Sequence, residues 1–281
     1  MAHSRGKRRL RTLVRNGWIS DQHGAWPMVI LPAFVGAQLA HRGSIAATAD
    51  TSAVIDPVLA TSLPITWLTG FLCFTAIERW ALTPKKRRPS CLPAIITWGI
   101  IATTTGLITV IRSPMLLLWT PVFLPLFVAA LWEVLHRRPR SPLARLTTVA
   151  AASLMLPVFA LGVVGAPSPL RATPELWRAT AILGSYFVGT VPFVRSMIRA
   201  RNDHRWEHAS VLWHLTSAVL ILLATIWGAV SWPIGVLWVI VACRAWAFPR
   251  WQRAHGPVKP MIIGMLEIVL SIVLSALIIL T

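Results

Sequence analysis

Repeated runs of about 20 apolar residues constrain the fold of this chain more than any other feature. A helix of about 20 residues spans the ~30 Å hydrocarbon core of a bilayer. Lipid offers the backbone no hydrogen-bond partners, so runs of this length predict helices. We therefore expect an all-α, polytopic transmembrane bundle of about nine helices, over residues 24–40, 60–80, 92–111, 114–134, 144–165, 174–194, 208–228, 231–246 and 261–280.

The composition supports a membrane protein and argues against a nucleic-acid-binding protein. Of the 281 residues, 56% are hydrophobic and only 13% are charged, which is too apolar for a water-soluble domain of this size. The net charge is +18, but the apolar runs separate the basic residues from one another. We expect membrane lipids with anionic headgroups, and not nucleic acid, as the partners of these charges.

The distribution of basic residues predicts the orientation of the chain. With the N-terminus in the cytosol, 23 of the 27 lysines and arginines fall on the cytosolic side. This bias follows the positive-inside rule and places the C-terminus outside the cell membrane. Residues 1–23 then form a basic cytosolic segment, and the short linkers predict one transmembrane domain over residues 24–281. The basic start followed by residues 24–40 also fits a cleaved signal peptide, although we favour a retained helix.

An arginine-rich junction between two apolar segments forms the first candidate ligand site. Arg195 and Arg199 are four residues apart, so they share a face if the helix continues, and Arg201 follows them. Arginine forks bind phosphate oxygens in pairs, which suits an anionic ligand. Asp203 and Glu207 have the spacing D-x-x-x-E, which makes them candidate Mg²⁺ ligands if a diphosphate binds here.

Two predicted helix starts add further candidates on the same side of the membrane. Gln22, His23 and Trp26 lie where the first helix begins, and Lys259 precedes the last one. Free backbone N–H groups at a helix N-terminus attract anions, so these side chains are candidate ligand contacts.

Glu267 is an acidic residue inside an apolar segment. At 1.5 Å per residue it lies about 12 Å along the helix from Lys259. A carboxylate at that depth is unfavourable in lipid, so we expect Glu267 to face the bundle interior and a polar partner. Either Arg195 or His23 is the predicted partner. His214, inside residues 208–228, is expected to be packed and hydrogen-bonded.

Three of these motifs together resemble a known family. QHGAW at residues 22–26, VRSMIRAR at residues 194–201, and the Lys259-Pro260, Gly264 and Glu267 pattern are similar to the YwiC-like family. That resemblance implies a multi-pass protein of the bacterial inner membrane. It supplies no activity and no catalytic residues.

A second resemblance is architectural. Nine helices with polar inner loops after the second and sixth are similar to the UbiA-type intramembrane prenyltransferases. That family binds a polyprenyl diphosphate through Mg²⁺ and two Asp-rich motifs in those loops. At the second loop this chain has only Asp203 and Glu207, and at the first Glu78 is followed by Arg79 and basic residues. The resemblance thus implies a related arrangement of helices with degenerate metal motifs.

Three functions stay open from the sequence. The first is binding of an anionic isoprenoid or phospholipid-like ligand at the cytosolic side, with or without transferase activity. The second is transport of an anionic solute, with Glu267 as an ion relay. The third is a non-catalytic assembly factor, in which the charges set topology alone.

Overall fold

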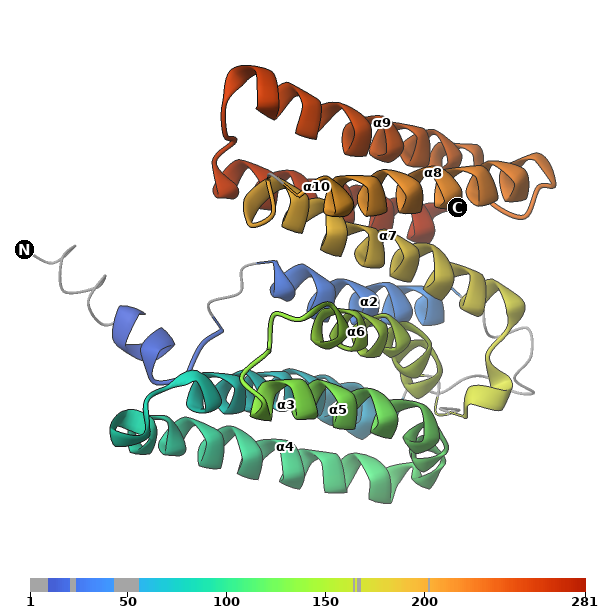
Figure 1. Cartoon of the computed structure of the whole chain (residues 1–281). Coiled ribbons are helices and arrows are strands. Elements are labelled where there is room, and N and C mark those ends of the chain that lie inside the picture. The colour runs from blue at the N-terminus through green and yellow to red at the C-terminus, as the bar shows by residue number, and fades with distance from the viewer. Residues whose placement is uncertain (1–9, 21–23, 43–55, 164, 166–167, 202) are drawn as a thin grey trace, which may run out of the picture. The chain divides into compact units, whose positions relative to one another are not determined.

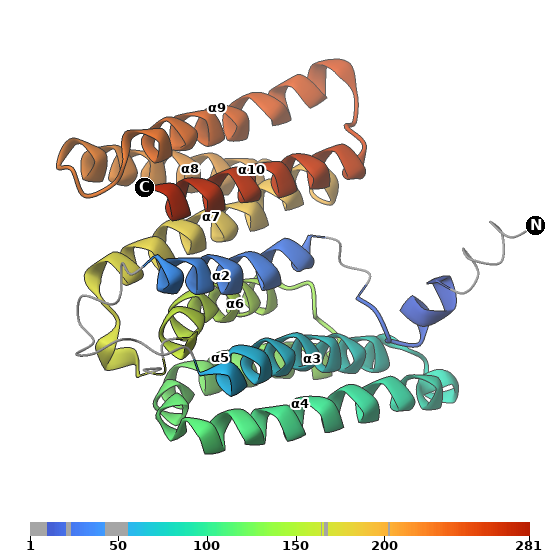
Figure 2. The ribbon, with the colours of Figure 1, turned by 180° about the vertical axis from the view of Figure 1, so that it is seen from behind.

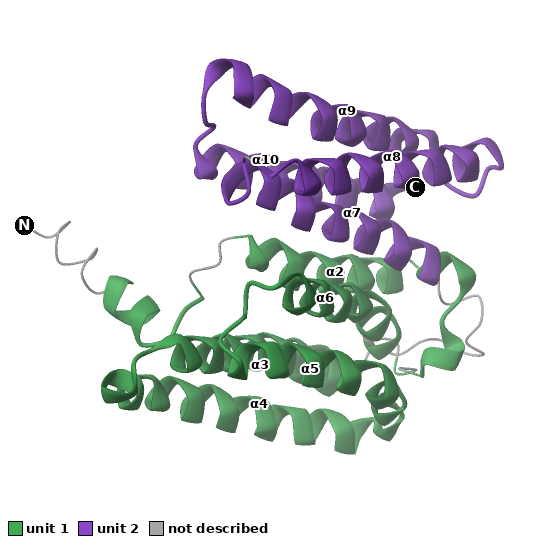
Figure 3. Ribbon diagram, viewed as in Figure 1, with its two compact units in different colours: residues 1–176 green, residues 177–281 purple. Residues whose placement is uncertain are grey.

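The structure is a computed structural model that describes residues 10–20, 24–42, 56–163, 165, 168–201 and 203–281. The regular elements in these ranges are helices, as the apolar runs predicted. The chain divides into two compact units, residues 1–176 and residues 177–281, which we describe separately (Figure 3).

In its described ranges, unit 1 has a short helical stretch at residues 10–15, five longer α-helices and three short 3₁₀ segments. The longer helices are α2 (Ala25–His41), α3 (Pro57–Leu82), α4 (Leu92–Arg112), α5 (Thr120–Leu135) and α6 (Pro142–Val163), and the 3₁₀ segments are η2 (Lys85–Cys91), η3 (Pro114–Trp119) and η4 (Pro169–Arg171). Helix α3 packs on α4, and α6 packs on both α2 and α5 (Figure 1). The contact of α2 with α6 needs Gly36, because a Cβ there would lie 2.1 Å from the Leu156 carbonyl oxygen.

The start of α3 shows how local sequence sets a helix boundary in unit 1. Asp56 accepts hydrogen bonds from the backbone N–H groups of Val58 and Leu59, and Pro57 occupies the first helical position. Arg112, at the end of α4, donates to the same carboxylate at 3.0 Å. The Leu59 N–H first, and then Arg112 and the Val58 N–H, lower the pKa of Asp56 below its usual value.

Unit 2 is a bundle of four helices: α7 (Pro174–Ile198), α8 (His204–Ile226), α9 (Trp232–His255) and α10 (Pro260–Leu280). Helix α8 lies in front of α10 in Figure 1, and α10 lies in front of α8 in the opposite view of Figure 2. These two helices therefore lie on opposite sides of the bundle, at a level between α7 and α9. Its apolar core near one end joins Phe193 and Met197 of α7 to Ala245 of α9 and Ile263 of α10.

The helices confirm a multi-pass membrane protein. Eight described helical spans are long and apolar enough to cross a bilayer, and α2 is a shorter apolar helix of 17 residues. Large apolar side chains stay exposed along these spans, such as Ile100 at 62% and Leu220 at 62%. Such surfaces fit lipid better than water. The orientation and the single transmembrane domain over residues 24–281 stay predictions.

One predicted boundary was wrong by nine residues. The apolar run predicted a segment over residues 231–246, whereas α9 continues to His255. Burial explains the extension: Phe248 packs against the core that includes Phe193 and Ile263, so the helix has an inward face beyond the apolar run. The extension places Arg244 inside the helix and not at its end.

Candidate functional site

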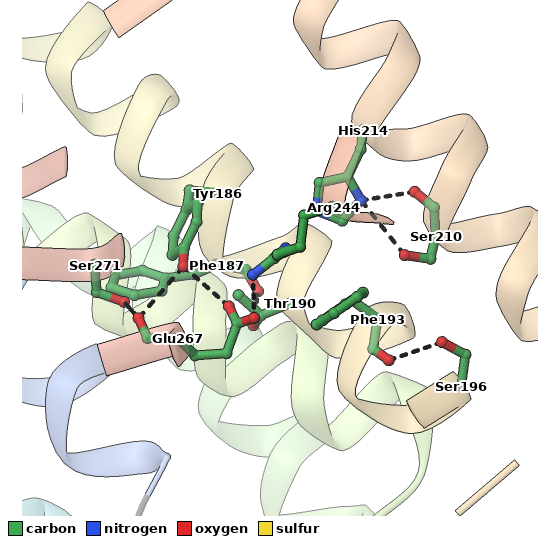
Figure 4. A network of polar contacts seen from close by, with 10 residues as sticks. All are labelled: Tyr186, Phe187, Thr190, Phe193, Ser196, Ser210, His214, Arg244, Glu267 and Ser271. Carbon is green, nitrogen blue, oxygen red and sulfur yellow. Dashed lines mark hydrogen bonds and ion pairs between the residues drawn. The ribbon is translucent and has the colours of Figure 1, made fainter. Parts of the chain in front are cut away.

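Glu267 is buried in unit 2 and is bound by two side chains from other helices. Arg244 of α9 donates through Nη1 to Glu267 Oε1, and Tyr186 of α7 donates from its hydroxyl to Oε2 at 2.9 Å. The Ser271 hydroxyl donates to the Glu267 carbonyl oxygen at 2.6 Å. Figure 4 shows the carboxylate between the tyrosine and the arginine. We call Tyr186, Arg244 and Glu267 the Glu267 cluster.

The Glu267 cluster lies deep along the helices that carry it. Arg244 is about 18 Å from the start of α9, and Tyr186 is about 18 Å from either end of α7, at 1.5 Å per residue. The Arg244 side chain is 4% exposed and that of Glu267 is 12% exposed. Because an arginine stays charged in proteins, this is an ion pair inside a membrane-spanning bundle.

Arg244 uses only part of its hydrogen-bonding capacity. Its guanidinium carbon lies 4.0 Å from the centre of the Phe193 ring, so one face of the group is stacked. Its Nη1 binds Glu267, but no acceptor among the described residues reaches Nε or Nη2. Most buried polar groups have a partner, so an arginine with a free edge marks this place as unusual.

His214 of α8 lies next to Arg244 in the same view (Figure 4). Its Nδ1 is 2.7 Å from the carbonyl oxygen of Ser210, and a carbonyl only accepts, so Nδ1 carries the proton. The predicted packing and hydrogen bonding of His214 are thus confirmed at Nδ1. Nε2 has no partner among the described residues and faces Gly189 of α7, where an added Cβ would lie only 2.9 Å away.

A second acid–arginine group lies where α8 begins and α9 ends. Arg253 binds both oxygens of Glu207, through Nη1 to Oε2 and through Nη2 to Oε1 at 3.2 Å. Arg250 Nη1 is 3.6 Å from Oε1, and His204 Nδ1 is 3.5 Å from Oε2. The Arg253 side chain is 43% exposed. We call His204, Glu207, Arg250 and Arg253 the Glu207 cluster.

The predicted arginines of the α7–α8 junction are only partly brought together. Arg199 and Arg201 line an open hollow with Asp203. Arg201 Nε donates to the Met197 carbonyl oxygen at 2.8 Å, while the Arg195 guanidinium lies 4.0 Å over the Trp206 ring. These contacts hold Arg195 and Arg201 against their own unit.

The described side chains predicted to contact a ligand at helix starts, Lys259 and Trp26, belong to different units. Lys259 precedes α10 and is exposed. Trp26 packs edge-on against Phe71 in unit 1, with ring centres 5.5 Å apart. Gln22 and His23 lie outside the described residues.

The candidate metal ligands have other partners. Asp203 caps α8 by accepting from the Arg205 N–H at 3.0 Å, and Glu207 is held by Arg253. In the described ranges, no group of three or more His, Cys, Asp or Glu side chains is close enough to hold a metal ion. A Mg²⁺ ion at Glu207 would have to displace the Arg253 guanidinium.

Arg195 was wrong as the predicted partner of Glu267, while the other predicted partner, His23, lies outside the described residues. The sequence contained signals for the partner that the structure shows. Arg195 lies over Trp206, and Arg244 is the partner. The segment predicted over residues 231–246 was the shortest of the nine, and lengthening it at its C-terminal end would have placed Arg244 well inside. Tyr186 is the chain's single tyrosine and lies inside an apolar run, although tyrosine usually marks interfaces.

The fold and this buried ion pair define a multi-pass integral membrane protein with a polar centre. The chain belongs to the YwiC-like protein family, whose family model matches residues 19–160. That match includes QHGAW, whereas the other two motifs and the Glu267 cluster lie beyond it. Neither the curated proteins nor the solved structures include a match to this chain.

Proposed function

We propose that this protein is a transporter of an anionic solute, with the Glu267 cluster as its binding site. The free Nε–Nη2 edge of Arg244 carries this proposal. This cationic edge has no acceptor in the part of the chain that the structure describes, and its side chain is 4% exposed near the middle of a spanning helix. Such an edge suits a negatively charged group that passes through the bilayer. Of the three functions left open by the sequence, this geometry therefore favours transport of an anionic solute, in which Glu267 acts as an ion relay.

The depth of Arg244 along its helix favours solute transport over binding of a lipid headgroup. The phosphate of a lipid lies at the membrane surface, so its arginines are expected at helix ends. At that end of unit 2, Arg195 and Arg201 contact their own unit, and Arg253 binds Glu207. Arg244, whose Nε and Nη2 have no acceptor among the described residues, lies about 18 Å inside α9.

Uptake into proteoliposomes tests the proposal. We expect the purified chain to accumulate at least one of labelled phosphate, sulfate and lactate. Uptake should disappear in the double variant Arg244→Gln with Glu267→Gln, which keeps the site electrically neutral. Arg253→Gln is the matched control and should transport at the wild-type rate. Equal uptake in the wild type, the double variant and empty vesicles would reject the proposal.

The open hollow at Arg199 and Arg201 supports a second candidate, binding of an anionic lipid or isoprenoid phosphate. Degenerate UbiA-like transferase activity belongs to this candidate. Native mass spectrometry of the wild type and Arg199→Ala tests it. A polyprenyl phosphate or diphosphate that is lost in the variant would support the second candidate, whereas a bare protein would count against it.

The orientation is part of the proposal. With the N-terminus in the cytosol and the C-terminus outside, the Glu207 cluster faces the cytosol, in accord with the bias of lysine and arginine. A reporter fused after Thr281 should then be active only outside the cell membrane. Activity restricted to the cytosol would reverse the assignment.

A further inference from the structure

The free edge of Arg244 indicates the class of solute. Nε–H and Nη2–H point in the same direction along one edge of a guanidinium, and this edge binds two oxygens of one group at once. Nη1 is already bound to Glu267 Oε1. The edge therefore suits an oxyanion with two neighbouring oxygens, such as a carboxylate or a phosphate ester.

The charge balance of the Glu267 cluster limits what binds with that oxyanion. Arg244 and Glu267 together are neutral, so a bound monoanion would leave one net negative charge inside the bundle. An uncompensated charge at that depth is strongly unfavourable. One proton taken up from water with the anion would restore neutrality.

Glu267 is placed to receive that proton. Its Oε2 is 2.9 Å from the Tyr186 hydroxyl, which now donates to it. The same hydroxyl lies 3.3 Å from the Glu267 carbonyl oxygen, a second acceptor. With a proton on Oε2, the carboxyl donates to the Tyr186 oxygen while the Tyr186 proton moves to the carbonyl. Each group keeps a hydrogen-bond partner in both protonation states.

We propose that the site binds one oxyanion on Arg244 and one proton on Glu267 together, so that transport is coupled to protons. This inference rests on the proposed transport function. The titratable and charged groups around Glu267 are Tyr186 from α7, Arg244 from α9 and, next to Arg244, His214 from α8. The unpartnered Nε2 makes His214 the competing proton acceptor.

Calorimetry of the full chain in lipid nanodiscs tests the coupling. Lactate and methanesulfonate are the probes, because each carries one negative charge and stays ionised near neutral pH. Titration in two buffers with different ionisation heats counts the protons bound with each anion. We expect one proton per anion in the wild type, and a Kd that rises tenfold per pH unit once the free carboxyl is ionised.

Glu267→Gln separates the two proton acceptors. We expect this variant to bind the anion without proton uptake and with a Kd that does not depend on pH, whereas His214→Gln keeps the uptake. Should Glu267→Gln fail to fold, an infrared difference spectrum of the wild type gives the same answer. Addition of the anion should remove a carboxylate band and create a protonated carboxyl band.

The outcomes distinguish this inference from the transport function beneath it. Anion binding without proton uptake, or proton uptake that survives in Glu267→Gln, overturns the coupling and leaves transport in place. Absence of binding for both probes, together with no uptake of phosphate, sulfate or lactate into proteoliposomes, overturns transport itself, and the coupling falls with it.

Discussion

Two acid–arginine pairs in the described part of unit 2 have carboxylate side chains of similar exposure but arginine side chains of very different exposure. The side chains of Glu267 and Glu207 are 12% and 8% exposed, whereas those of Arg244 and Arg253 are 4% and 43% exposed. Arg253 binds its acid through two nitrogens, while Arg244 uses one and leaves an edge free. The two pairs therefore differ in the surroundings of the cation, and that difference points to separate roles.

The Glu207–Arg253 pair, at the start of α8 and the end of α9, is suited to holding these two helices together. Arg250 and His204 also lie near Glu207, so the loss of one partner leaves others in place. The pair at mid-helix has no alternative partner of this kind for its arginine, because Glu267 is the only carboxylate bound to Arg244 among the described residues. Four predictions test this contrast.

The largest expected effect comes from removing each arginine. Arg244→Gln leaves a buried carboxylate without its cation, which typically costs about 3–5 kcal/mol of the free energy of unfolding. Arg253→Gln should cost only about 0.2–1 kcal/mol, because that arginine is half exposed and Arg250 remains. Thermal unfolding of both variants in the same detergent measures the difference. Equal losses of stability would remove the contrast.

A double-mutant cycle sharpens the comparison. Pairing Arg244→Gln with Glu267→Gln should recover much of the loss, with a coupling energy of about 2 kcal/mol for groups in direct contact. The same cycle at Arg253 and Glu207 should give about 0.5 kcal/mol. A coupling near zero at Arg244 and Glu267 would mean that the buried pair is not a unit.

Tyr186→Phe tests the third member of the Glu267 cluster. The variant removes a hydroxyl that donates to a charged carboxylate at 2.9 Å but keeps the ring. We expect a loss of about 1.5 kcal/mol in the free energy of unfolding, since Arg244 still neutralises Glu267. Chemical denaturation followed by tryptophan fluorescence measures it. An unchanged midpoint would show that the hydroxyl contributes nothing to this carboxylate.

Added salt should cause the smallest of the four changes in stability, and it should weaken the exposed pair but not the buried one. The Debye length falls from about 10 Å at 0.1 M salt to about 3 Å at 1 M, which weakens exposed pairs and barely affects buried ones. The small difference between wild type and Arg253→Gln should vanish at 1 M NaCl. The difference between wild type and Arg244→Gln should persist, and its disappearance would place Arg244 in contact with water.

The sequence predicted the class of protein and most helix positions because each apolar run is itself the physical reason for a spanning helix. It also singled out Glu267, since an acid inside such a run needs a partner. The partner was missed because hydropathy falls after Trp246, whereas packing of Phe248 carries α9 on to His255. A periodic or apolar pattern reports one helix, but a cross-helix contact depends on packing.

The same limit applies to the arginines at the α7–α8 junction. Their spacing predicted neighbours on one helix face, but α7 ends before Arg199 and Arg201, which lie beyond the helix. The spacing also carried no information on what each guanidinium contacts. Arg195 stacks on Trp206, and Arg201 donates to a carbonyl in the last turn of α7. The free cationic edge belongs to Arg244, which lacks the neighbouring arginines that marked the junction.

Binding of lactate to three proteins in nanodiscs tests the central claim most directly. These are the wild type, the neutral double variant Arg244→Gln with Glu267→Gln, and Arg253→Gln. We predict equal Kd values for the wild type and Arg253→Gln. The double variant should bind at least about tenfold more weakly, because it lacks the hydrogen bonds from the free edge of Arg244. Undiminished binding in the double variant, or loss of binding in Arg253→Gln alone, would contradict an anion site at Arg244.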